Sequence, residues 1–147
     1  MTFVNHFDIS LWKICDGYYH RHQALCLELQ DNHQLNVNLL LLSLWLDKQD
    51  YLLSTLDWSQ LQSETHQWEE RVLLPYRKLR KLSKNSLASD EYQQMLDVEL
   101  MLERKSQGLI LHKLKQLSPS GESSNLGTYL SLFNLDKVDY PSLVELV

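Results

Sequence analysis

The chain has 147 residues, with 19 acidic and 14 basic side chains that give a formal net charge of −5. Proteins that bind nucleic acids or anionic membranes need a positive surface, so this acidic balance argues against both classes, except for a local contact. With four glycines and three prolines, the sequence has few of the turn signals that a many-stranded sheet requires. We therefore predict one all-α fold, a compact bundle of five to six helices.

The N-terminal segment lacks the basic start and the long apolar run of a secretory signal peptide. The apolar segment around residues 39–42 is shorter than the roughly 18 residues that a membrane span needs. We therefore expect a cytoplasmic protein that makes no contact with a membrane. Cys15 and Cys26 lack the spacing of a zinc site or a redox pair, so we predict two buried thiols.

Two helices are expected at the start of the chain. Asp8 or Ser10 can cap a short helix that begins near Leu11 and ends at Gly17. A second helix spans about residues 19–33, where apolar side chains recur at the three-and-four spacing of one helical face. The opposite side of this helix is polar and is expected to face water.

The third predicted helix is the most apolar segment of the chain. It runs from Val37 to about Lys48, and its leucines together with Trp45 cover every direction around the axis. A helix of this kind must be central to the bundle, because it has no polar face to present to water. Asn36 stands just before it and is placed to cap its first turn.

A long fourth helix begins at Asp57 or Ser59 and continues to about Ser83. We expect Pro75 to kink this helix without ending it, because the apolar periodicity resumes beyond the proline. The side chains assigned to its core side are Trp58, Leu61, Trp68, Val72, Leu79 and Leu82.

A fifth helix spans about residues 90–117, with Ser89 as its cap, and can pack antiparallel along the fourth. Residues 118–125 contain one proline, one glycine and four serines, which is the composition of a flexible linker. We therefore divide the chain into a helical bundle domain (residues 1–117), this linker and an apolar tail (residues 126–147). The tail can dock on the bundle or bind a neighbouring chain.

A polar cluster is expected where the second and third helices meet, because the short connection between them makes them antiparallel neighbours. Its members are Gln30, Asp31, His33, Asn36 and Asn38. Such groups could bind a small polar ligand, with Asp31 or His33 as acid or base and Gln30 and Asn38 orienting the ligand. The alternative is that they cap helices and satisfy one another.

Six basic side chains gather in the fourth helix and the turn after it, although the protein is acidic. They are Arg71, Arg77, Lys78, Arg80, Lys81 and Lys84. Arg77, Lys81 and Lys84 share one helical face, where they could clamp a phosphate or an acidic partner. The alternative is a solvated face, or pairing with acidic side chains of the fifth helix such as Glu99 and Glu103.

Few residues indicate catalytic or metal chemistry. The sequence has neither a Gly-x-Ser-x-Gly nucleophile motif nor a glycine-rich phosphate loop. It contains no Glu-x-x-His motif, His20 and His22 fall on different helix faces, and His66 and Glu70 lack a third ligand. We therefore expect no cofactor and no metal, and we lean towards a protein that is not an enzyme.

The motifs within residues 7–105 resemble those of an uncharacterised bacterial family of short helical proteins, a domain of unknown function. The pattern is Leu-Gln-Asp, then Val-Asn-Leu-Leu-Leu, then tryptophan and Pro-x-Arg, and the matching positions include Gln30, Asp31, Asn38, Trp45, Trp68, Arg71, Pro75 and Arg77. The chain departs from the pattern at Gln34, where glycine is usual, and at Asn36, where aspartate is usual. A helix cap survives the second change, since Asn and Asp cap about equally, whereas a ligand scheme that needs the carboxylate does not. The resemblance implies no activity.

The lack of a nucleophile, a metal set and a phosphate loop favours a non-catalytic cytosolic interaction module. It would bind an unidentified protein partner through the basic helix and the apolar tail, and the tail could also join two copies into a homo-oligomer. The alternative is a small-molecule or enzymatic site at the polar cluster. A third hypothesis is a local nucleic-acid contact by the basic helix, whose affinity would fall steeply with salt.

Overall fold

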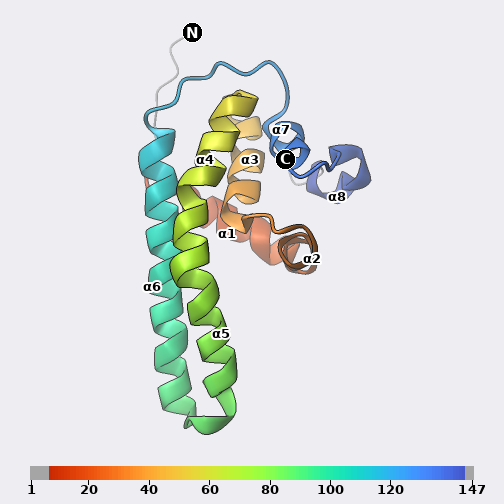
Figure 1. The fold of residues 1–147 in the computed structure, drawn as a ribbon. Helices are drawn as coiled ribbons and strands as arrows, with labels where there is room; N and C mark the ends of the chain where they lie inside the picture. Colours follow the sequence, from red (N-terminus) through yellow and green to blue (C-terminus); the bar gives the residue numbers. More distant parts are fainter. Residues whose placement is uncertain (1–6, 145–147) are drawn as a thin grey trace.

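The computed structural model describes residues 7–144, and every regular element in that range is helical, which confirms the all-α prediction (Figure 1). None of the helices in these residues is long and apolar enough to cross a membrane. The α-helices are α1 (Leu11–Arg21), α2 (Gln23–His33), α3 (Val37–Lys48), α4 (Thr55–Trp68), α5 (Leu74–Ser83), α6 (Ser89–Leu114), α7 (Asn125–Ser131) and α8 (Pro141–Val144). A π-helical turn (Glu69–Leu73) joins α4 to α5, and two 3-10 turns lie at Lys84–Ser86 and Lys137–Asp139.

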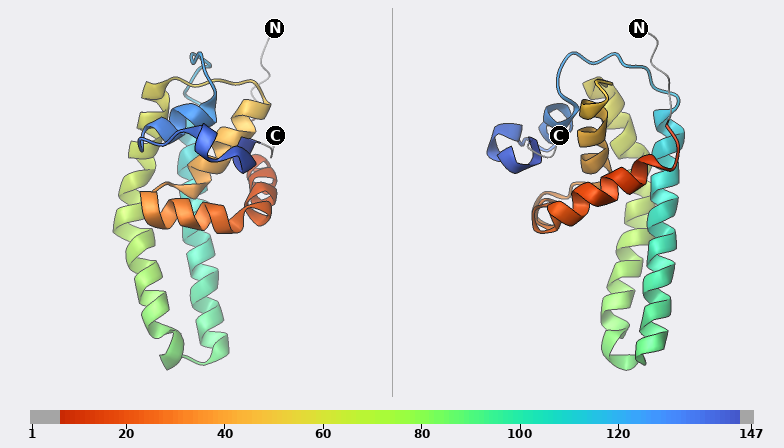
Figure 2. Two further views of the ribbon diagram at one scale, coloured as in Figure 1. Left: turned by 90° about the vertical axis from the view of Figure 1, so that its right-hand side faces the viewer. Right: turned by 180° about the vertical axis from the view of Figure 1, so that it is seen from behind.

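Helix α3 is the centre of the molecule, as its sequence predicts. All residues from Leu39 to Leu46 are buried, and α1, α2 and α7 pack around the helix (Figure 2). The helix has the predicted bounds, and Asn36 caps it: the Asn36 side-chain oxygen accepts a hydrogen bond of 3.3 Å from the Leu39 N–H. A helix without a polar face is therefore enclosed on all sides.

The boundary between α1 and α2 differs from the prediction. Gly17 does not end the first helix, which continues to Arg21 and breaks at His22 instead. One glycine inside a helix costs only about 1 kcal/mol relative to alanine, and burial of Tyr18 in the following position offsets that loss. The second helix is accordingly shorter than the expected range of residues 19–33.

Helices α4 and α5 form one long rod with the π turn between them (Figure 1). The rod begins earlier than predicted, because Ser54 caps it: the Asp57 N–H donates to Ser54 Oγ at 3.1 Å, and the Ser54 N–H donates to Asp57 at 3.3 Å. Pro75 does not end the rod, as predicted. Proline cannot donate a backbone hydrogen bond and its ring clashes with the carbonyl four residues back, and the wider π turn directly before it accommodates both defects.

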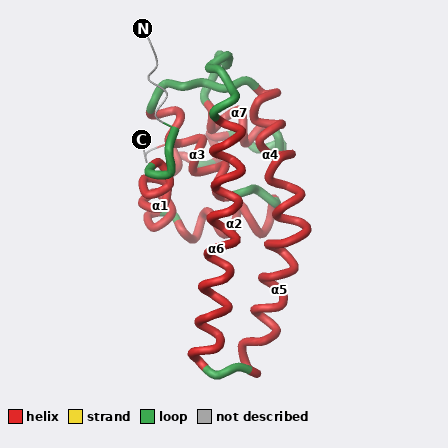
Figure 3. Tube along the Cα trace, turned by 90° about the vertical axis from the view of Figure 1, so that its left-hand side faces the viewer, coloured by secondary structure: helices red, strands yellow, loops and turns green. Residues whose placement is uncertain are grey.

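Helix α6 runs antiparallel along the α4–α5 rod, and α5 with its partner half of α6 extends beyond the other helices (Figures 1 and 3). We call α5, the turn over residues 84–88 and residues 89–103 of α6 the hairpin, and the remaining helices the head. Tyr76 and Trp68 bridge the two helices by donating to backbone carbonyls of α6 at 2.8 Å and 3.0 Å. The prediction that Leu79 and Leu82 face the core is wrong: both are exposed, because the head ends before it reaches them.

The start of α7 is anchored in the head by one fully buried amide. The Asn125 side-chain oxygen accepts hydrogen bonds from the Leu53 N–H (2.9 Å) and from Trp58 Nε1 (3.0 Å). Its side-chain nitrogen donates to the Tyr51 carbonyl at 2.9 Å. Asn125 thus lies at the end of the segment expected to be a linker, and it satisfies three groups of the head.

The tail after Asn125 packs on the head of the same chain. Helix α7 packs on α3, and Leu126, Tyr129, Leu130 and Leu143 belong to the same buried cluster as the leucines of α3 (Figure 2). The structure therefore places these four tail side chains in the core of the head, whereas Val138 and Val144 are exposed.

Candidate functional site

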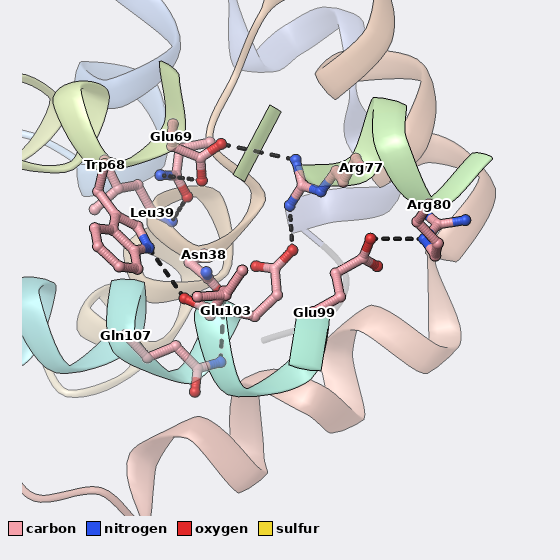
Figure 4. Close-up of polar contacts among 11 residues, drawn as sticks. Asn38, Leu39, Trp68, Glu69, Arg77, Arg80, Glu99, Glu103 and Gln107 are labelled. Atoms are coloured by element: carbon pink, nitrogen blue, oxygen red, sulfur yellow. Dashed lines mark hydrogen bonds and ion pairs between the residues drawn. The ribbon is translucent and has the colours of Figure 1, made fainter. Parts of the chain in front are cut away.

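Part of the predicted polar cluster meets Arg77 in a cleft between the head and the hairpin (Figure 4). The cleft has a volume of about 230 Å³. Its polar lining consists of Asp16, Tyr19, Gln30, Asn36 and Asn38 from the head and of Glu69, Arg77, Glu103 and Gln107 from the rod and α6. Asp31 and His33 do not line it: Asp31 is exposed and His33 is half-buried. The two residues considered as acid or base are therefore outside the cleft.

Arg77, which lines the cleft, lies between two carboxylates (Figure 4). Its Nη2 donates to Glu103, and its Nη1 is 3.8 Å from a carboxylate oxygen of Glu69. Glu69 also accepts a weak hydrogen bond of 3.4 Å from the Asn36 side chain. Burial raises the pKa of Glu69, and the nearby Glu103 raises it further, while Arg77 opposes both effects.

Glu69 is the first residue of the π turn, so the widened turn lies between Glu69 and Arg77. Four polar residues of the cleft are not among the predicted site residues, namely Asp16, Tyr19, Glu69 and Gln107, and Glu103 is predicted only as an ion-pair partner. Pro75 is the signal that could have directed attention to Glu69, since a proline inside a helical pattern requires an irregular turn just before it, and such turns are frequent at functional sites.

The amide side chains of the cleft are only partly satisfied. Asn38 accepts a hydrogen bond of 3.3 Å from the Gln107 side chain (Figure 4). Within residues 7–144, the Gln30 side chain has no hydrogen-bond partner, although it lines the cleft. The cleft therefore offers a free donor and a free acceptor beside the half-buried carboxylate of Glu69, which suits the binding of a small polar molecule.

Asn36 has a structural role. Besides capping α3, its backbone N–H donates to the hydroxyl of Tyr129 at 3.0 Å, and that hydroxyl donates to Gln62 at 2.9 Å. Tyr129 is fully buried in α7. Asn36 is therefore a helix cap within a satisfied hydrogen-bond network, which is the structural alternative for this residue. Its hydrogen bond to Tyr129 also connects the lining of the cleft to α7.

The predicted basic cluster is divided in the structure. Arg77 and Arg80 pair with acidic side chains of α6, since Arg80 Nε lies 2.7 Å from Glu99 and Nη1 donates to Tyr92 at 3.0 Å. Arg71, Lys78, Lys81 and Lys84 are exposed, and none of them forms an ion pair with the part of the chain that the structure describes. The expectation of intramolecular pairing therefore holds for the two arginines alone.

The hairpin exposes apolar side chains on the side that faces away from the head. Leu79, Leu82, Val98 and Met101 are 53%, 80%, 39% and 60% exposed. On α5, Leu79 and Leu82 lie two and five residues after Arg77, and on α6, Met101 and Val98 lie two and five residues before Glu103. At 100° per residue, each side chain is therefore about 200° or 140° around its helix from a residue that lines the cleft. We call these four residues the outer face. Among the helices of residues 7–144, none lies in front of α5 and its partner half of α6 on the side away from the head (Figure 3).

A model of a family described as proteins of unknown function, DUF2390, matches residues 10–110. The chain belongs to this family. No curated protein and no solved structure matches it. The part of the chain that defines membership in DUF2390 includes every residue that lines the cleft and the whole hairpin, and it ends before α7.

Proposed function

We propose that this DUF2390 protein is a non-catalytic interaction module that binds a protein partner on the outer face of the hairpin. The observation that carries the proposal is the exposure of the four outer-face side chains, on two helices that no other described helix covers on that side. Contiguous apolar side chains on a water-exposed surface are typical of sites that another protein covers. The basic helix of the sequence analysis is retained as a docking element.

The apolar tail is not retained, because Leu126, Tyr129, Leu130 and Leu143 are buried in the same cluster as the leucines of α3. The paired arginines are not retained either, since their charges are already neutralised by α6. The exposed cation nearest the outer face is Lys78, one helical turn before Leu82, whereas Lys81 and Lys84 share the helical face of Arg77 on the side of the cleft. A partner with acidic side chains around an apolar surface is therefore favoured.

Affinity capture from the cells that produce the protein tests the proposal. We expect the chain with both Leu79→Asp and Leu82→Asp to lose its partner and keep its fold, because both side chains are exposed in the free protein. The matched control is Leu56→Asp, which changes a 67% exposed leucine of the head. Retention of the partner by the double variant would overturn the proposal.

A second candidate function is the binding of a small polar molecule in the cleft. It is supported by the Gln30 amide without a partner in residues 7–144, next to Glu69 with its raised pKa. Native mass spectrometry of gently purified protein should then show one bound species that the Gln30→Leu variant loses. A spectrum with the mass of the chain alone would contradict this second candidate.

We also propose a cytosolic location. Cys15 and Cys26 are both buried and unpaired, which fits a reducing compartment.

A further inference from the structure

The cleft between the head and the hairpin has an excess of negative charge. Its acidic lining residues are Asp16, Glu69 and Glu103, and among residues 7–144 Arg77 is the one basic residue that lines it. Arg77 Nη2 donates to Glu103, so the positive charge of the cleft is already used by a carboxylate of α6. A bound anion would therefore meet uncompensated carboxylates, whereas a bound cation would reduce the excess charge.

The Glu69 carboxylate has only weak partners. Its nearest cation, Arg77 Nη1, is 3.8 Å away, and the hydrogen bond that it accepts from the Asn36 side chain is 3.4 Å long. Neither of its oxygens forms a shorter hydrogen bond or ion pair with the described residues. Burial raises the pKa of Glu69, as expected for a half-buried carboxylate without a close cation. Glu69 can therefore accept a stronger hydrogen bond from a donor that enters the cleft.

The position of Arg77 favours an organic cation over a metal ion. Its guanidinium lies between Glu69 and Glu103, with one nitrogen directed at each carboxylate (Figure 4). A metal ion needs several oxygen ligands within about 2.0–2.6 Å, and the guanidinium occupies the space where these two carboxylates would have to meet. A cation that binds Glu69 alone, through N–H groups as Arg77 binds Glu103, needs no such convergence.

The rest of the lining suits an amine or a guanidinium on a short carbon chain. The Gln30 side chain has no hydrogen-bond partner within residues 7–144, so its oxygen can accept a second N–H group of the ligand. Val37, Leu41 and Leu100 line the same cleft and offer an apolar surface to methylene groups. The volume of about 230 Å³ lies below the roughly 300–1,000 Å³ of sites for drug-sized ligands, so the ligand must be small.

We propose that the cleft binds a small alkylamine or alkylguanidine, with its cationic head on Glu69 and Gln30 and its methylene groups against the apolar lining. The proposal rests on the second candidate function, the cleft as a binding site for a small polar molecule, and it names the chemical class of that molecule. Glu69 supplies the charge that selects a cation, and Gln30 supplies the second acceptor.

Isothermal titration calorimetry of the purified full chain tests the chemical class with three probes that share a four-carbon chain. Agmatine carries an amine and a guanidinium, butanediol is neutral and succinate is an anion. We expect saturable binding of agmatine with a dissociation constant of about 1 mM or lower, and no saturable binding of the other two probes. No binding of agmatine, or equal affinity for all three probes, would overturn the proposal. This comparison uses the wild type alone, so it does not depend on the folding of a variant.

A charge-removing substitution tests the role of Glu69. Glu69→Gln should weaken agmatine binding about tenfold or more, because a hydrogen bond to a charged group is replaced by one to a neutral amide. The matched control is Glu64→Gln, which removes the same charge from an exposed position of α4 outside the cleft and should bind agmatine like the wild type. Circular dichroism should show the same helix content in both variants. Equal losses of affinity in the two variants would overturn the assignment of Glu69.

The class of ligand and the cleft as a site fail separately. If agmatine does not bind, while native mass spectrometry shows a neutral or anionic molecule that the Gln30→Leu variant loses, the chemical class is wrong and the cleft is still a binding site. If no bound molecule depends on Gln30 or Glu69, both proposals are wrong.

Discussion

Arg80 and Glu99 join the two helices of the hairpin across 2.7 Å, and both side chains are largely shielded from water. Arg80 also donates to the Tyr92 hydroxyl, so one guanidinium contacts two turns of α6. Helix α5 contains no fully buried side chain. Polar contacts, more than a core, therefore hold this end of the hairpin together and set the geometry of the outer face.

Replacing Arg80 with alanine should loosen the hairpin locally. The change removes two hydrogen bonds of a charged group and leaves Glu99 partly buried without its partner, so we expect a loss of about 2 kcal/mol. Hydrogen exchange of the α5 amides should become roughly 30-fold faster in the variant, as that energy implies. The exposed Lys81→Ala control should exchange like the wild type, and equal rates in both variants would show that the ion pair does not hold the hairpin.

Replacing Asn125 with alanine should destabilise the head as a whole. The variant leaves the Leu53 N–H, the Tyr51 carbonyl and Trp58 Nε1 without their buried partner, and we expect a loss of about 3 kcal/mol or more. Urea unfolding followed by tryptophan fluorescence measures it. Asn85→Ala in the exposed turn of the hairpin should change the free energy of unfolding by less than about 0.5 kcal/mol. Comparable losses in the two variants would be inconsistent with an anchoring role for Asn125.

Helix α3 and Asn125 show which features the sequence predicts and which it does not. The place of α3 follows from composition, because a helix with no polar side can only be enclosed. Asn125 lies in a stretch with the composition of a linker. No neighbouring residue in the sequence indicates that its side-chain amide binds the Leu53 N–H, which is 72 residues earlier in the chain. For the same reason the periodicity of Leu79 and Leu82 indicates an amphipathic helix but does not show where the core ends.

The cleft illustrates the same limit. The sequence predicts that Gln30 and Asn38 lie together, on two neighbouring helices, but it assigns Arg77 to a separate basic cluster on a third helix. Their meeting point depends on the angle at which the head packs on the rod. The π turn lies between Glu69 and Arg77 and changes the angle between the two side chains around the rod, and a regular helix pattern does not include that turn.

Two glycines should respond to alanine in opposite directions. A Cβ at Gly121 would overlap the Leu53 carbonyl, to which no flexible side chain can yield, so Gly121→Ala should destabilise the protein by about 1–3 kcal/mol. A Cβ at Gly108 would meet nothing within 4 Å, and alanine there should stabilise α6 by about 0.5–1 kcal/mol. Thermal unfolding compares the two. A fall in Tm for both variants would contradict the open position of Gly108.

The buried thiols predict a loss of stability at high pH. Burial raises the pKa of Cys15 from 9.0 to about 12, so between these values the folded chain retains a proton that the unfolded chain releases. The free energy of unfolding should therefore fall as the pH rises above about 9. The Cys15→Ala variant should show a shallower fall between pH 8 and pH 10 in urea titrations. Parallel curves for the two proteins would mean that this thiol is not protected in the folded state.

The docking role of the outer face is tested most directly by a photo-crosslinking amino acid at position 82, compared with the same group at position 56, in the cells that produce the protein. Both leucines are strongly exposed in the free chain, one on the hairpin and one on the head. We predict a protein adduct of one defined mass from position 82 and none from position 56. The absence of an adduct at position 82, or the same set of adducts from both positions, would contradict the proposal that the outer face binds a protein.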